Sequence, residues 1–132
     1  MRTKADLEAY LRSSGQHVED VAENTWLVRD PYDASKSIAV AINDGVVLFR
    51  MKVIELAEVK RDRDKLFQRL LELNAAEMLH GAYGVGNDAI LITCALRLEN
   101  LDMSELQATL DDFAVAFTKH YQTIASFRDA GH

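Results

Sequence analysis

A tight-turn signal between two alternating segments constrains the fold of this chain most strongly. Residues Asn43-Asp44-Gly45 stand between segments 37–42 and 46–54, and in both segments apolar residues recur at every second position. Gly adopts a positive φ angle at no steric cost, and Asn and Asp tolerate one, so these three residues predict a hairpin. Strands joined by so short a turn are antiparallel, which excludes a wholly parallel sheet.

The second of these segments also predicts which face of the sheet is buried. The odd-numbered positions from 47 to 53 are all apolar, whereas Arg50 and Lys52 stand on the opposite side. Shifting the strand by one residue would bury both cations, so the register is well specified. We expect the apolar side to face the core.

Hydrophobic periodicity assigns the remaining elements. Helical spacing is present over residues 4–13, 62–78 and 102–124, and extended segments cover 17–29, 80–86 and 89–98, with Asn24 as a bend in the first of them. The pairs Thr3/Asp6 and Asp102/Glu105 have the spacing of helix N-caps. The predicted order is α-β-β-β-α-β-β-α. This order predicts one α+β domain over residues 1–132, with an antiparallel sheet of about five strands and helices on one face.

The second helix has an apolar stripe with one polar member. The stripe contains Phe67, Leu70, Leu71, Asn74 and Met78, and it is widened by Leu66 and Leu73. A buried amide costs free energy unless it finds hydrogen-bond partners. Asn74 is therefore expected to cap or bind a neighbouring backbone, or to fix the register at a subunit interface. A local structural role is favoured over ligand binding.

Charge and composition exclude several classes of protein. Fifteen Lys and Arg against 21 Asp and Glu give a net charge of −6, which opposes binding to a nucleic-acid backbone. No apolar run approaches the roughly 20 residues of a membrane-spanning helix, so no membrane insertion is expected. A single cysteine cannot form an internal disulfide. These features predict an acidic cytoplasmic protein.

No group of residues has the spacing of a catalytic or metal site. Cys94 alternates with Ile92 and Leu96 on an apolar strand, where a free thiol behaves as a small hydrophobic group. His120 is expected to be a packed or solvated side chain of the last helix. The glycines of residues 81–86 precede a strand, whereas a phosphate-binding loop leads into a helix. We therefore expect no metal, no cofactor and no enzymatic activity.

The order of elements resembles the type III secretion chaperone-like superfamily. The stretch Leu70-Leu71-Glu72-Leu73-Asn74-Ala75 and the strand-turn-helix passage over residues 96–110 carry this resemblance, which extends over nearly the whole chain. The superfamily includes chaperones of injected effectors, such as the Tir chaperone, and YbjN-type proteins. The resemblance implies a non-enzymatic homodimer that binds an extended segment of another protein, such as a secreted effector.

The resemblance also implies where two copies would meet. In the superfamily the dimer forms around the second helix and the following strand. The corresponding residues here are Phe67, Leu70, Asn74, Gly81 and Tyr83. Glycine in this strand would allow two backbones to approach closely.

The partner surface is expected on the first helix and a sheet edge. The candidates are Leu7, Tyr10, Leu11 and Trp26, although core packing explains these four residues equally well. The first helix has only a narrow apolar stripe, which favours a YbjN-like relative. The alternative function is a small-molecule-sensing regulatory domain of the YbjN-like type. Its ligand would occupy a cavity near Asn74, Tyr83 and His120, because polar residues interrupt the apolar stripes there.

Overall fold

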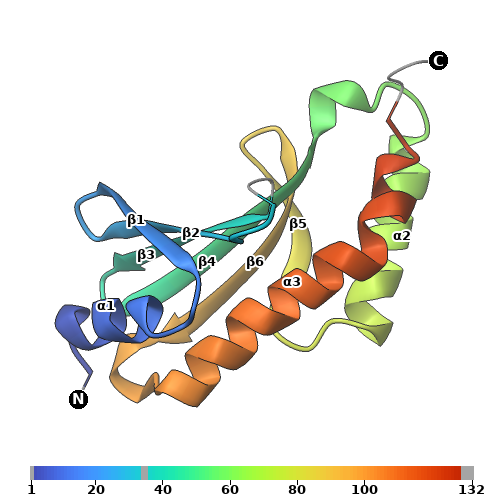
Figure 1. Cartoon of the computed structure of the whole chain (residues 1–132). Helices are drawn as coiled ribbons and strands as arrows, with labels where there is room; N and C mark the ends of the chain where they lie inside the picture. The colour runs from blue at the N-terminus through green and yellow to red at the C-terminus, as the bar shows by residue number, and fades with distance from the viewer. Residues whose placement is uncertain (1, 34–35, 129–132) are drawn as a thin grey trace.

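Three helices and six strands make up the computed structural model, which describes residues 2–33 and 36–128 (Figure 1). The elements are α1 (Lys4–Arg12), β1 (His17–Ala22), β2 (Thr25–Arg29), β3 (Ser37–Asn43), β4 (Val46–Glu55), α2 (Arg63–Ala76), β5 (Ala82–Gly86), β6 (Ala89–Arg97) and α3 (Met103–Ala125), with short 3-10 turns at Leu56–Glu58 and Leu98–Asn100. The predicted α+β class is confirmed. Within these residues no helix is both long and apolar enough to cross a membrane.

The strands form one antiparallel sheet in the order β1-β2-β3-β4-β6-β5. The predicted hairpin lies between β3 and β4: Asn43 pairs with Val46, and Asp44 and Gly45 have φ angles of 53° and 78°. Two central residues with positive φ form the turn that matches the twist of the flanking strands. The hairpin prediction is therefore confirmed.

The sheet has one strand more than the sequence predicts. Residues 17–29, predicted as one bent strand, form the hairpin β1–β2, in which Ala22 pairs with Thr25. Asn24 takes a φ of 58° in this turn. The bend was correctly predicted at Asn24, but the chain reverses its direction there. Asn can take up the left-handed conformation that this tight turn needs, so no glycine is required. The count of about five strands becomes six.

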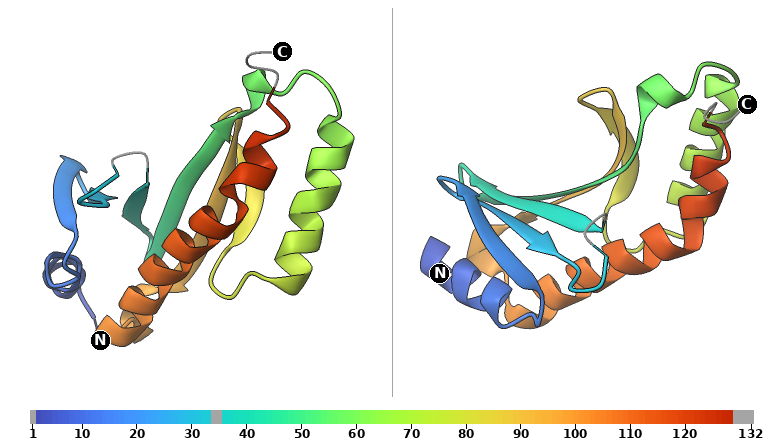
Figure 2. Two further views of the ribbon diagram at one scale, coloured as in Figure 1. Left: turned by 45° about the vertical axis from the view of Figure 1, so that its right-hand side comes forward. Right: turned by 45° about the horizontal axis from the view of Figure 1, so that its top comes forward.

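All three helices lie on the same side of the sheet, and α3 crosses its middle strands (Figure 2). The side chains of Val47, Phe49 and Met51 on β4 are buried on this side, as predicted. Phe113 of α3 packs edge-on against Phe49, with 6.3 Å between ring centroids. Burying each side chain of this size contributes about 1.5–3 kcal/mol, so this layer is the core.

The buried stripe of α2 differs from the predicted one. Leu66, Leu70 and Leu73 are buried, whereas Leu71 is 68% exposed and Phe67 is half-buried. The wide apolar surface of this helix contains more leucines than one sheet face can cover. The sequence pattern therefore does not determine which of them point inward.

Two predicted N-caps are present. Thr3 and Asp6 form a reciprocal capping box on α1, and the Asp102 carboxylate accepts a hydrogen bond from the Glu105 amide at 2.8 Å on α3. The Arg2 side chain also donates to the Leu101 carbonyl at 2.9 Å, so the two helix starts are held together. The two side-chain caps satisfy N–H donors that each helix leaves open in its first turn.

Candidate functional site

Asn74 joins α2 to the edge strand β5. Its Nδ2 donates to the Tyr83 carbonyl at 3.2 Å, and its Oδ1 accepts from the Tyr83 amide at 2.7 Å. β5 is the last strand of the sheet, so these two main-chain groups point away from β6 and have no strand partner. The side chain of Asn74 takes the place of that partner. Of the roles predicted for Asn74, binding a neighbouring backbone is confirmed.

The Tyr83 side chain continues this connection into α3. Its hydroxyl oxygen lies 2.7 Å from Nδ1 of His120, and both residues are buried. Burial raises the pKa of Tyr83, so the hydroxyl keeps its proton and can donate a hydrogen bond either to the His120 ring or, at 3.5 Å, to the Ala116 carbonyl. On the other side of the ring, Nε2 lies 3.5 Å from a Glu77 oxygen. The His120 ring and the Lys119 ammonium both lower the pKa of Glu77.

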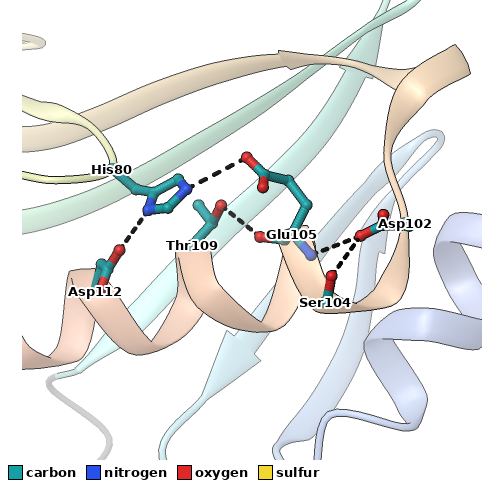
Figure 3. A network of polar contacts seen from close by, with 6 residues as sticks. All are labelled: His80, Asp102, Ser104, Glu105, Thr109 and Asp112. Carbon is teal, nitrogen blue, oxygen red and sulfur yellow. Dashed lines mark hydrogen bonds and ion pairs between the residues drawn. The ribbon is translucent and has the colours of Figure 1, made fainter.

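A second histidine ties the loop between α2 and β5 to α3 (Figure 3). His80 Nδ1 contacts the Asp112 carboxylate, and His80 Nε2 lies 3.3 Å from a Glu105 oxygen. Asp112 and Glu105 stand seven residues apart on α3, so one imidazole bridges two helical turns. The hydrogen bond that the His80 ring donates to Asp112 is the largest of the effects that raise the pKa of His80, and burial opposes it. The protonated ring can donate to both carboxylates at once.

The raised pKa of His80 predicts how stability depends on pH. A group whose pKa is higher in the folded state stabilises the fold fully below its unfolded value, near 6.5, and loses this contribution as the pH rises through the folded value. We expect the thermal midpoint to fall as the pH rises from about 6.5, and His80→Gln to flatten this slope. Thermal unfolding followed by circular dichroism between pH 6 and 9 measures it. The same substitution at the exposed His17 is the control, and equal slopes in wild type and His80→Gln would contradict the prediction.

Gly81 connects this loop to β5 at a point of close approach. Its φ is +88°, and a Cβ placed there would lie 2.7 Å from the Thr93 carbonyl oxygen and 2.9 Å from the Phe113 ring. Only glycine meets both requirements. The close approach expected for this glycine therefore occurs within the chain; its part in a dimer stays a prediction. Gly84 has open space where its Cβ would be.

Several apolar side chains of α2, β5 and the loop between them are exposed to solvent. Leu71 of α2, Leu79 of the following loop and Val85 of β5 are 68%, 84% and 55% exposed, and Phe67 of α2 is half-buried. We call these four residues the α2–β5 surface; Figure 2 shows α2 and β5 side by side at one end of the molecule. Phe67 was predicted from the sequence as an interface residue, whereas Leu79 and Val85 were not. A leucine or valine beside the predicted glycines was the available signal.

The five predicted interface residues are thus mostly brought together. Leu70 and Tyr83 are buried, and Asn74 and Gly81 make contacts within the chain. Of the five predicted residues, only Phe67 contributes exposed area to the α2–β5 surface. The inner residues hold β5 and its loop in place, and the exposed residues around them are free for contact.

The four predicted partner-binding residues lie elsewhere, at α1. Leu7, Leu11 and Trp26 are buried in the core, and Tyr10 is half-buried. The Trp26 indole donates to the Glu8 carboxylate at 3.0 Å, which fixes α1 on β2. Core packing, the other explanation weighed for these residues, is what the burial of three of them shows. Tyr10 alone keeps exposed area for a partner.

One hollow in the described part of the chain touches His120. It has a volume of about 100 Å³ and lies between the end of α2, the following loop and α3. Among residues 2–33 and 36–128, no three His, Cys, Asp or Glu side chains are placed to hold a metal ion. The Cys94 thiol is half-buried, and burial raises its pKa, which disfavours the reactive thiolate.

These features define a class of protein: an antiparallel sheet covered by helices, with exposed apolar side chains on α2, on the edge strand β5 and on the loop between them. Solved structures with this fold include the type III secretion chaperone SycH of Yersinia pestis, in complex with a fragment of YscM2 (16% identity, TM-score 0.62, covering 88% of this chain and 97% of that one). A chain of the ExsC–ExsE complex matches with 11% identity and a TM-score of 0.70, covering 99% of this chain and 100% of that one. An uncharacterized protein from Methanothermobacter thermautotrophicus matches with 13% identity and a TM-score of 0.68, covering 93% and 96%.

At these identities the likeness shows the fold, which is that of the type III secretion chaperones. The sequence gives the more specific assignment, because the model of the CesT_Tir_1 family matches residues 1–130. The chain belongs to the CesT_Tir_1 family. A comparison with curated proteins finds no match. The resemblance inferred from the sequence is confirmed.

Proposed function

We propose that this chain is a non-enzymatic, dimeric protein-binding domain that captures a segment of a partner protein. The observation that carries the proposal is the α2–β5 surface, where three large apolar side chains are more than half exposed on adjoining elements. Exposing large apolar side chains to water costs free energy, and exposed apolar area beside an edge strand is typical of interaction sites. Its burial against a second copy would remove that cost.

The geometry supports α2 and β5 as the contact between copies. Asn74 and His80 fix the strand and its loop on the helices, so the exposed leucines and valine stand on a rigid support. A preformed surface loses less conformational entropy on association than a mobile one. Phe67 would contribute directly, while Leu70, Asn74, Gly81 and Tyr83 would act from beneath.

Relatives support the capture of a partner segment. SycH was solved with a fragment of YscM2, and SchA with HopA1 in a chaperone–effector complex. By analogy we propose that the partner of this chain is another protein, such as a secreted effector, and that binding takes place in the cytoplasm. Co-purification from the native host tests this proposal, and recovery of no protein partner by a tagged wild-type chain would contradict it.

If copies pair through the α2–β5 surface, a charge at Val85 should weaken the dimer. Val85→Asp would bury a carboxylate in the contact, so we expect the dimer dissociation constant to rise about tenfold or more. Sedimentation at micromolar concentrations measures it. Val21→Asp is the matched control, because Val21 is 52% exposed on the opposite edge strand, β1. A wild-type chain that is monomeric throughout this range would remove the basis for the dimer.

The alternative, a small-molecule sensor, finds less support. Asn74, Tyr83 and His120 do lie together, but hydrogen bonds to one another and to the backbone occupy most of their polar atoms. The hollow beside them, about 100 Å³, is well below the roughly 300 Å³ at which ligand pockets begin. We therefore favour the protein-binding function.

A further inference from the structure

β6 extends beyond the strand that covers its outer edge. β5 pairs with residues 89–93 of β6, so residues 94–97 have a neighbour only on the β4 side. The reason is Gly81, where the chain turns out of the sheet toward α3. In Figure 1 this part of β6 lies behind the first half of α3.

The direction of the main-chain groups in this segment follows from the register. In an antiparallel pair, successive residues point their N–H and C=O groups alternately toward and away from the partner. The main-chain groups of Tyr83 bond to Asn74 and so point away from β6. The next pair along the two strands, Ala82 and Thr93, is therefore a hydrogen-bonded pair. Ala95 and Arg97 follow Thr93 at every second position of β6, so their main-chain groups also point to the side of β5. No strand is there to receive them.

A hydrogen bond on the opposite side of β6 agrees with this alternation. Leu98, an odd number of residues from Ala95 and Arg97, donates its amide to Gly45 on the β4 side at 3.0 Å. Ala95 and Arg97 are both exposed. Within the described residues, four main-chain hydrogen-bonding groups therefore have no strand partner along one short edge.

Two hollows follow this edge and meet at Ala95. One, of about 430 Å³, lies on the helix-free side and is lined by residues that include Leu48, Arg50 and Thr93. The other, of about 420 Å³, lies toward α3 and is lined in part by Leu96 and Leu101. Small side chains and open backbone leave room for an extended chain.

The charges around the edge differ between the two hollows. Arg50 is the one charged residue that lines the first, and among the described residues neither Arg50 nor Arg97 forms an ion pair. The acids of the second hollow are already engaged: Asp102 accepts from the Glu105 amide, and Glu105 contacts His80. Asp44 and Glu99 line a third hollow with Arg97, without pairing to it.

We propose that residues 94–97 of β6 are a docking site for an extended acidic segment of a partner protein, which adds as a strand in line with β5. This inference rests on the proposed function and names the chemistry of the partner. Main-chain bonds to Ala95 and Arg97 would supply the pairing. Carboxylates at alternate positions of the segment would face Arg50 and Arg97, and apolar residues between them would face Leu96 and Leu101.

A pair of proline variants tests the open edge without any ligand. Ala95→Pro removes an amide that no neighbouring strand pairs with, so we expect a loss of at most about 3 °C in the thermal midpoint. Thr93→Pro removes an amide bonded to β5 and is expected to cost about 10 °C or more. Equal losses in the two variants would overturn the assignment of the edge.

A peptide probe tests the docking itself. The probe is an acetylated and amidated decapeptide that alternates Val and Glu, and its control alternates Val and Lys. We expect the acidic peptide to shift the amide NMR signals of Ala95 and Arg97, with affinity about tenfold weaker for Arg50→Glu. Lys52→Glu is the matched control, because Lys52 stands on the same face opposite Leu91, where β5 covers the edge. Its effect should be smaller.

The outcomes separate this inference from the proposed function. No shift at millimolar peptide, equal shifts with both peptides, or shifts confined to β1 would overturn it. Shifts at Ala95 and Arg97 that depend on protein concentration alone would assign the edge to a second copy and overturn it too. A monomer that still binds the acidic peptide there would contradict the dimer and support the docking site, and a dimer that does not bind it would contradict the docking site alone.

Discussion

Gly81→Ala is expected to destabilise the fold by about 2–5 kcal/mol. A left-handed backbone costs a residue with a side chain about 1–2 kcal/mol, and forcing a methyl into packed surroundings typically costs about 1–3 kcal/mol more. The added methyl would lie within 3 Å of both the Thr93 carbonyl and the Phe113 ring. Since the carbonyl belongs to the sheet, it cannot move aside cheaply.

Gly45→Ala separates the two contributions. Gly45 has a similar φ of +78°, but nothing lies within 4 Å of the position of its Cβ. We expect Gly45→Ala to show the backbone cost of about 1–2 kcal/mol alone. Urea unfolding of both variants measures the difference. Equal losses of unfolding free energy in the two variants would mean that the close contacts around Gly81 do not contribute to the need for glycine at this position.

Asn74→Ala is the second large effect, expected to cost about 2–4 kcal/mol. It would leave the amide and the carbonyl of the buried Tyr83 without partners, and each unsatisfied group costs about 1–3 kcal/mol. Hydrogen exchange at the Tyr83 amide should accelerate together with the loss in unfolding free energy. Asn100→Ala, at an exposed position, is the control and should change little. Normal protection of the Tyr83 amide in Asn74→Ala would mean that another group supports the β5 edge.

Local patterns predicted the fold well where a pattern has one physical solution. On β4, only one register keeps Arg50 and Lys52 in water, and the structure has that register. On α2 the pattern had two solutions, because leucines surround much of the helix, and the sequence did not distinguish the buried Leu70 from the exposed Leu71. Without the positions of β5 and α3, periodicity cannot show which leucine the core accepts.

The candidate site was less predictable, because its contacts join distant parts of the chain. His80 is 25 residues from Glu105 and 32 from Asp112, so no spacing rule connects them. Asn74 was recognisable as a polar residue in an apolar stripe, but its partner depends on how the chain returns after Gly81. The exposure of Leu79 and Val85 likewise depends on β5 being the last strand of the sheet.

The bonds between Asn74 and Tyr83 also limit how copies of this chain can assemble. An unprotected edge strand can pair with the same strand of another molecule, and repeated pairing builds fibrils. Here a side-chain amide occupies the Tyr83 position, and only Val85 among the inner residues of β5 keeps its main-chain groups directed outward. One free residue is too short for a stable ladder. Contact between copies through β5 itself would therefore rely on side chains, which would favour a closed pair over an open-ended polymer.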